Sequence, residues 1–177
     1  LTGGVLFSGN DRKALNAVSS MISTEKPDLV IFTGDVSFAV PYTGTINNNY
    51  AHTFLTQLME RLGVYYTVSF GNHDSEAYNF LNRKRVATIY ENESLDYSLF
   101  SSNDGDVYGE CNHVINVKNS LGLITQSLII IDTNSYTEND LLGLQGSYDK
   151  VHDSQITWYE NTINALKTKN QLVYSNL

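Results

Sequence analysis

Two short apolar segments, each followed by a polar loop that contains a glycine, constrain the fold of this chain most. Residues 29–32 are apolar throughout and lead into Thr33-Gly34-Asp35, while residues 64–70 lead into Gly71-Asn72-His73-Asp74. A continuous apolar run is typical of a strand that is covered on both faces, as in a parallel sheet. We therefore predict that the two segments are neighbouring strands of a layered α/β domain.

A helical pattern precedes each predicted strand. Apolar residues recur at helical spacing from Leu15 to Ile22, with Asp11 as the predicted N-cap, and again from Phe54 to Leu62. Gly63 follows the second pattern at the position of a helix C-cap. The repeated order of helix, strand and polar loop favours an α/β domain, and 177 residues are enough for one hydrophobic core.

The second half of the chain follows a different pattern. Strands are predicted at residues 95–100, 114–117 and 123–132, with turn-forming residues between them. A last helix is predicted from Asp153 to about Lys167, and residues 171–174 are expected to begin another strand. The apolar face of that helix would hold Ile156, Tyr159, Ile163 and Leu166.

Side chains that can bind metal ions occur in both polar loops. The carboxyl ends of adjacent parallel strands lie at one edge of a sheet, so Asp35 is expected near Asn72 and His73. Gly34 and Gly71 would allow a close approach of the two backbones. A carboxylate can bridge two cations, an amide oxygen can ligate one without adding charge, and an imidazole can ligate a metal or transfer a proton.

The segment Asp28-Leu29-Val30-Ile31-Phe32-Thr33-Gly34-Asp35, followed by Ser69-Phe70-Gly71-Asn72-His73-Asp74, closely resembles the calcineurin-like metallophosphoesterases. The later stretch from Gly146-Ser147-Tyr148-Asp149 to Trp158-Tyr159-Glu160 resembles the branch related to purple acid phosphatases. The resemblance implies a layered, metallophosphoesterase-type β-sandwich flanked by helices. Residues 1–177 would form a single but incomplete domain of this type.

The resemblance also implies roles for four residues. Asp35 matches the aspartate that bridges two metal ions, and Asn72 matches the amide that ligates the second metal. His73 matches the catalytic histidine that contacts the substrate phosphate and protonates the leaving oxygen, while Asp74 matches its orienting acidic neighbour. The implied cofactors are two metal ions from among Fe, Zn and Mn. The implied reaction is hydrolysis of a phosphomonoester or phosphodiester, either a small molecule or a phosphoprotein, by a metal-activated water.

Other ligand motifs of the family do not occur in residues 1–177. The Asp-x-His motif of the first strand is absent, as are the C-terminal histidine and the Gly-His-x-His segment. Asp35 and Asn72 alone are too few ligands for a dinuclear site. We therefore expect a longer and active native protein, and an inactive 177-residue chain.

Two alternatives involve no catalysis at this site. The first is a phosphoesterase-like domain that binds a phosphorylated ligand or a protein partner without hydrolysing it. The second, a Rossmann-type nucleotide site, rests only on Gly3-Gly4 and the α/β pattern, and the glycine fingerprint is absent.

Charge and hydropathy restrict the partners. The formal net charge of −8 disfavours a nucleic-acid backbone as a partner, and it suits a protein whose carboxylates are neutralised by bound cations. No apolar run approaches the roughly 20 residues of a transmembrane helix. Residues 1–10 lack signal-peptide features, but a signal peptide could precede Leu1, so the sequence assigns no compartment.

The remaining histidines and one basic run are predicted to have no catalytic role. His52 is expected to face solvent, His113 lies at a strand start without a metal-like spacing, and His152 is structural or on the surface. The run Arg83-Lys84-Arg85 is predicted to be a solvated helix end.

Overall fold

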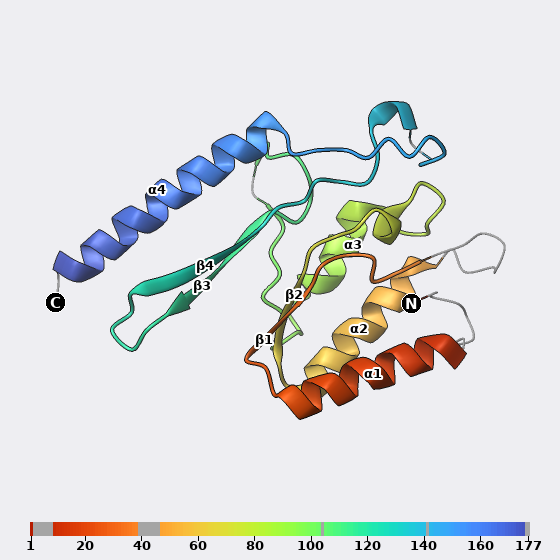
Figure 1. Cartoon of the computed structure of the whole chain (residues 1–177), viewed down its shortest axis with the longest axis horizontal. Helices are drawn as coiled ribbons and strands as arrows, with labels where there is room; N and C mark the ends of the chain where they lie inside the picture. The colour runs from red at the N-terminus through yellow and green to blue at the C-terminus, as the bar shows by residue number, and fades with distance from the viewer. Residues whose placement is uncertain (2–8, 39–46, 104, 141, 176–177) are drawn as a thin grey trace.

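The computed structural model of the chain describes residues 1, 9–38, 47–103, 105–140 and 142–175, of which 173–175 are described by their backbone only. Gly3-Gly4 lies outside these residues. In chain order the elements are α1 (Gly9–Glu25), β1 (Leu29–Phe32), α2 (Asn48–Leu62), β2 (Tyr65–Val68), η2 (His73–Ser75), α3 (Arg83–Tyr90), β3 (His113–Lys118), β4 (Ile124–Ile130), η3 (Glu138–Asp140) and α4 (Asp153–Ser175) (Figure 1).

The first part of the fold is a parallel strand pair with three helices beside it. β1 and β2 pair in register from Leu29↔Tyr65 to Phe32↔Val68, which confirms the two predicted parallel strands. α2 packs against both α1 and α3 (Figure 1). β2 is buried from Tyr66 onwards, whereas every residue of β1 is half-buried. Full burial of both strands, as expected from their apolar runs, is therefore seen only for β2.

The hydrophobic core lies between β2, α2 and α3. Buried apolar side chains from these elements pack together, and each Val, Leu or Met among them contributes roughly 1.5–3 kcal/mol through removal from water. The core residues of these three elements are Leu55, Met59, Tyr66, Val68, Val86, Ala87 and Tyr90. Gly63 ends α2 as predicted, with φ 66° and its N–H bonded to the carbonyl of Met59 at 3.0 Å. This cap turns the chain from α2 directly into β2.

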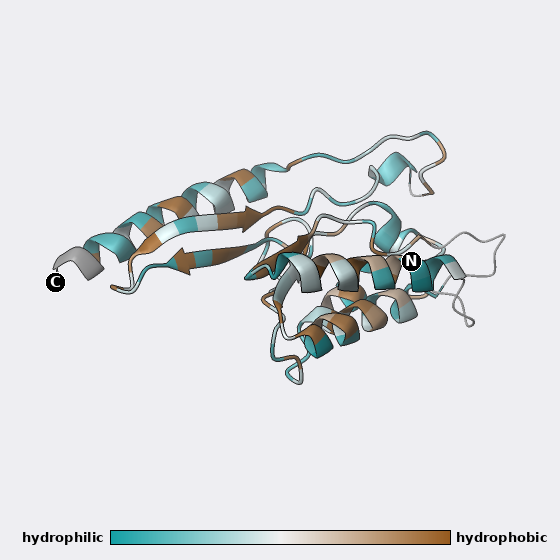
Figure 2. Ribbon diagram, turned by 60° about the horizontal axis from the view of Figure 1, so that its bottom comes forward, coloured by the Kyte–Doolittle hydropathy of each residue, from teal (hydrophilic) through white to brown (hydrophobic). Residues whose placement is uncertain are grey.

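The second part is an antiparallel hairpin with a long helix alongside it. β3 and β4 pair from His113↔Ile130, and α4 runs beside the hairpin, away from α1–α3 (Figures 1 and 2). Asn170 joins the two at the far end, because its side chain bonds both the N–H and the carbonyl of Ile124 at 2.9 Å. Among the described residues, no helix is long and apolar enough to cross a membrane.

One prediction for the C-terminal region is wrong and another holds in part. The expected strand at 171–174 is helical, because α4 continues to Ser175. Ile156 and Tyr159 are 48 % and 43 % exposed, whereas Ile163 and Leu166 are half-buried, so only the second half of the predicted apolar face is packed. In the first turn of α4 the fully buried side chain is the polar Gln155.

The described residues contain two small sheets, each with two strands, so the predicted β-sandwich is not formed by them. The expected strand at 95–100 makes a single bridge, between Ser98 and Tyr66, with hydrogen bonds on both sides of Tyr66. It thus lies beside β2 without extending the sheet. The structure is a mixed α/β arrangement, and assignment of residues 1–177 to one domain stays a prediction.

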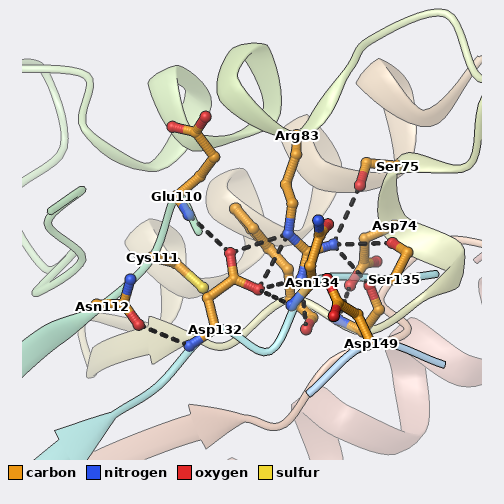
Figure 3. Close-up of polar contacts among 12 residues, drawn as sticks. Asp74, Ser75, Arg83, Glu110, Cys111, Asn112, Asp132, Asn134, Ser135 and Asp149 are labelled. Atoms are coloured by element: carbon orange, nitrogen blue, oxygen red, sulfur yellow. Dashed lines mark hydrogen bonds and ion pairs between the residues drawn. The ribbon is translucent and has the colours of Figure 1, made fainter. Parts of the chain in front are cut away.

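A buried ion pair connects the two parts. Arg83, the first residue of α3, is 8 % exposed and binds the fully buried carboxylate of Asp132, which follows β4 (Figure 3). The Arg83 Nη2 to Asp132 Oδ1 distance is 2.5 Å, and Nε lies 2.9 Å from Oδ2. Burial alone would raise the pKa of Asp132, but hydrogen bonds and charge from Arg83 hold it below its ordinary value. The prediction of a solvated helix end is therefore wrong for Arg83.

Two buried amide side chains support Asp132 from the other side. Asn112 accepts the N–H of Asp132 at 2.9 Å, and Gln155 donates to both the Asp132 carbonyl and Asn112. Since Gln155 lies in the first turn of α4, this network fixes the start of that helix against the end of β4. The hairpin, α4 and α3 are thereby joined through one set of polar contacts.

Replacing Arg83 with Met is expected to destabilise the fold by about 3–5 kcal/mol, because it leaves the buried Asp132 carboxylate without a counter-charge. Urea unfolding followed by circular dichroism measures this change. The matched control is Arg85→Met, on the same helix but exposed, which should change the free energy of unfolding by no more than about 0.5 kcal/mol. Equal effects of the two substitutions would show that the ion pair does not stabilise the fold.

Two histidines lie in the core. His52 is fully buried, which corrects the solvent-facing prediction: Nδ1 lies 2.7 Å from the Tyr90 hydroxyl, and Nε2 lies 3.7 Å from Asp74 Oδ1. His113 begins β3, as predicted, and contacts Thr67 at 2.6 Å and the Cys111 carbonyl at 2.8 Å. Burial lowers the pKa of both His52 and His113 from the usual 6.5, because charged imidazole is poorly solvated in the core.

The stability of the protein is expected to fall as the pH drops from about 7.5 to about 5.5. On acidification the unfolded chain gains protons at these histidines before the folded chain does, so each contributes at most about 1.4 kcal/mol of lost stability. Urea unfolding at both pH values measures the loss, and His113→Gln should remove about half of it. Protonation of Asp132 lowers the stability only at a lower pH, since the pKa of this carboxyl lies below 3.8. A free energy of unfolding that stays constant or rises over this range would contradict the prediction.

Candidate functional site

The loops after β1 and β2 meet at the carboxyl ends of the two strands, as predicted. The backbone N–H of Ser69 bonds the carbonyl of Phe32 at 2.8 Å, which continues the strand pairing into the loops. Beyond it, the N–H of His73 donates to Asp35 Oδ1 at 3.1 Å. Asp35 is exposed, and Asn72 and His73 are half-exposed, so these three predicted site residues lie together with access to solvent.

The approach of the two loops depends on glycine at both contact positions. Gly34 has φ +102°, and a Cβ at this residue would lie 2.6 Å from the Gly71 nitrogen. A Cβ at Gly71 would collide with the Asp35 carboxylate and lie 2.5 Å from its backbone nitrogen. Asp35 itself has φ +52°, a left-handed conformation that is uncommon outside glycine. The position of the Asp35 carboxylate is therefore set by tight backbone contact.

Asp74 holds the loops together from the inside. Its carboxylate is fully buried and accepts the N–H groups of Asp35 at 2.9 Å, Gly71 at 2.8 Å and Ser37 at 2.9 Å. A buried carboxylate needs such donors to offset its desolvation. The side chain thus binds loop backbone, and the carboxylate in contact with the His73 ring belongs to Glu76.

His73 lies in η2, one residue after Asn72. Its Nδ1 is 3.0 Å from Glu76 Oε1, and the ring of Phe38 packs edge-on against the imidazole at a centroid distance of 4.6 Å. Glu76 was not among the site residues predicted from the sequence, although residues three apart in a short helical turn lie on one face.

Asn72 is oriented by a residue from a distant loop. Its Nδ2 donates to the hydroxyl of Tyr136 at 2.9 Å, which leaves the amide oxygen as the group that can bind a ligand. Partial burial and the Glu76 carboxylate raise the pKa of Tyr136, so its hydroxyl stays protonated. Tyr136 lies 64 residues from Asn72, and no local pattern in the sequence indicates this contact.

A polar cavity of about 290 Å³ opens beside Asn72. Its far wall includes Asp149, which accepts a hydrogen bond from Tyr108 at 2.5 Å and lies 3.0 Å from the ring of His152. His152 stacks on Tyr108, which agrees with its predicted structural role. The cavity is lined by Thr33, Ser69, Phe70, Gly71, Asn72, Ile131, Thr133, Asn134, Ser135, Tyr148 and Asp149.

The described residues do not complete a metal centre. No group of three or more His, Cys, Asp or Glu side chains in this part of the chain is arranged to hold a metal ion. The nearby carboxylates of Asp74 and Asp132 are saturated by backbone donors and by Arg83. Asp35 and Asn72 together fall short of the ligand number that two metal ions need.

The substitution Gly71→Ala is expected to destabilise the protein by about 1–3 kcal/mol and to displace the Asp35 loop, because the added methyl group overlaps Asp35. Chemical unfolding measures the energy, and amide chemical shifts of Asp35 and His73 report the displacement. The control is Gly9→Ala at the start of α1, where nothing lies within 4 Å and the free energy of unfolding should change by no more than about 0.5 kcal/mol. If Gly71→Ala has the stability and spectrum of the unsubstituted protein, the tight contact is refuted.

Comparison with known proteins identifies the family of the chain. The sequence model of the calcineurin-like phosphoesterases matches residues 8–175. Two Arabidopsis thaliana proteins, named probable inactive purple acid phosphatase 14 and 28, are 27 % and 26 % identical over 163 and 168 residues, in each case 86 % of this chain. The chain spans 39 % and 40 % of the length of these relatives. No solved structure matches. With almost its whole length matched by the family's sequence model, the chain belongs to the calcineurin-like phosphoesterase family.

Proposed function

We propose that this chain provides Asp35, Asn72 and His73 to a site that hydrolyses a phosphate ester with the help of two metal ions. The observation that carries the proposal is the contact between the two loops, with the His73 N–H on the Asp35 carboxylate at 3.1 Å. Fe, Zn or Mn ions would polarise the phosphoryl group and activate water. The ligands that Asp35 and Asn72 do not supply would come from outside the described residues.

The chain's own residues have distinct parts in this proposal. Asn72 presents an uncharged amide oxygen, because its nitrogen is held by Tyr136. Asp35 presents a carboxylate that the tight loop contact keeps in place. His73 is held at Nδ1 by Glu76, so Nε2 is the nitrogen that can give a proton to the leaving oxygen. Asp74, the fourth predicted site residue, would act by keeping both loops in position.

A second candidate function is binding of a phosphorylated ligand or protein partner without hydrolysis. Two observations favour it: the described residues hold no group of three metal-competent side chains, and the two Arabidopsis relatives are named as inactive. The retained trio of Asp35, Asn72 and His73 favours the hydrolase, since a binding domain has no need for a proton donor beside two ligand positions.

The decisive experiment compares the product of the complete gene with the 177-residue chain. Both are purified, supplied with Fe, Zn or Mn, and tested for bound metal and for hydrolysis of an aryl phosphate. The complete protein should bind two ions and hydrolyse the ester, and His73→Ala should lower kcat about 10²–10⁴-fold through loss of the general acid. The short chain should show no hydrolysis.

His152→Ala is the matched control, because this histidine stacks on Tyr108, is not among the residues that line the cavity, and should leave kcat close to that of the unsubstituted protein. A metal-replete protein that is no faster than its His73→Ala variant would exclude the hydrolase. Saturable binding of the aryl phosphate in that case would support the non-catalytic domain.

A further inference from the structure

We propose that Glu76 is a positioning residue that fixes the ring and tautomer of His73, with Nδ1–H directed to Glu76 and Nε2 directed to the substrate. The catalytic consequence of this role rests on the proposed function. The tautomer and orientation of the His73 ring follow from the contacts of Glu76 alone.

Glu76 is built into the protein as an internal acceptor. The residue is 7 % exposed, and its Oε1 lies 3.0 Å from Nδ1 of His73. The other oxygen, Oε2, accepts the hydroxyl of Tyr78 in a short hydrogen bond. An ionised carboxylate is an acceptor only, so the ring nitrogen that faces it must carry the hydrogen.

Tyr136 joins Glu76 to the second site residue. Its hydroxyl donates to Glu76 Oε1 at 3.1 Å and accepts from Asn72 Nδ2 at 2.9 Å. A series of hydrogen bonds therefore runs from Asn72 through Tyr136 and Glu76 to His73. These bonds hold the Asn72 amide and the His73 imidazole, both predicted site groups, in fixed positions relative to each other.

The other neighbours of His73 leave Glu76 as the group that orients the ring. Asp74, the adjacent carboxylate, is fully buried and bonds the N–H groups of Asp35, Gly71 and Ser37. Phe38 packs edge-on against the imidazole and restricts its rotation without offering an acceptor. The His73 side chain is 30 % exposed, which leaves part of the ring open to a ligand.

This arrangement has a direct chemical consequence. As the oxygen of the attacking water forms a bond to phosphorus, the ester bond breaks and its electron pair passes to the leaving oxygen, which takes the proton of imidazolium Nε2–H. The product is neutral imidazole with Nδ1–H still bonded to Glu76. Since the hydrogen bond to Glu76 exists before and after the transfer, the ring does not need to rotate.

The first test uses the 177-residue chain and needs no hydrolysis. Two-bond ¹H–¹⁵N correlation spectra at a pH where His73 is neutral distinguish a protonated ring nitrogen from a bare one. The unsubstituted chain should show His73 with Nδ1 protonated, and Glu76→Gln, of nearly equal size, should lose that preference. Glu60→Gln is the matched control, because Glu60 accepts the backbone N–H groups of Asp96 and Tyr97 away from His73.

Two results would overturn the inference: Nε2 protonated in the unsubstituted chain, or an unchanged tautomer in Glu76→Gln. The first of these is decided without any variant, so the test holds even if Glu76→Gln does not fold.

The second test separates this inference from the proposed function. In the complete protein, Glu76→Gln should lower kcat about 10–100-fold while KM changes less than about twofold, as for other residues that orient a catalytic group. Glu60→Gln should change neither constant. If the complete protein hydrolyses no phosphate ester, the proposed function fails, and the tautomer spectra still decide the role of Glu76. An equal loss of kcat in both variants would show that Glu76→Gln acts through a general loss of stability and would contradict the positioning role of Glu76.

Discussion

The arrangement of the site depends on the buried ion pair between Arg83 and Asp132. A guanidinium in the core is costly unless it is fully bonded, and Arg83 satisfies its donors with Asp132, with the carbonyls of Phe70 and Gly71, and with two serine hydroxyls. The carbonyls belong to the loop after β2, and Asp132 follows β4. One side chain therefore fixes the site loop to the hairpin.

The site loop is held from two sides by opposite charges. The N–H of Gly71 donates to the Asp74 carboxylate at 2.8 Å, and its carbonyl accepts from Arg83 at 3.0 Å. Gly71 also packs too closely against Asp35 to leave room for a side chain. A shift of Gly71 would therefore move the Asp35 carboxylate as well. Asn72 and His73 follow directly, so the position of every predicted site residue depends on the bonding of one glycine backbone.

Local patterns predicted the parts of the fold that depend on neighbouring residues. The Gly63 cap, the positions of β1 and β2 and the meeting of the two loops follow from periodicity and from glycine at the strand ends. Contacts between distant residues were not predicted. Arg83 lies 49 residues from Asp132, and His52 lies 38 from Tyr90, so a basic run and a polar helix start resembled solvated surface. Residues 171–174 have an apolar strand-like pattern, but they form the last turn of α4, beyond the Asn170 contact with Ile124.

The acidic character of the chain has a structural explanation at several positions. Asp74 binds loop N–H groups, Glu76 binds two tyrosines and His73, Asp132 binds Arg83, and Asp140 binds the N–H groups of Gln145 and Ser147. All four are buried, so their charges are offset by internal donors rather than by bound cations. The net charge of −8 is therefore no measure of metal-binding capacity. Asp35 differs from these four, because its side chain is exposed at the junction of the loops.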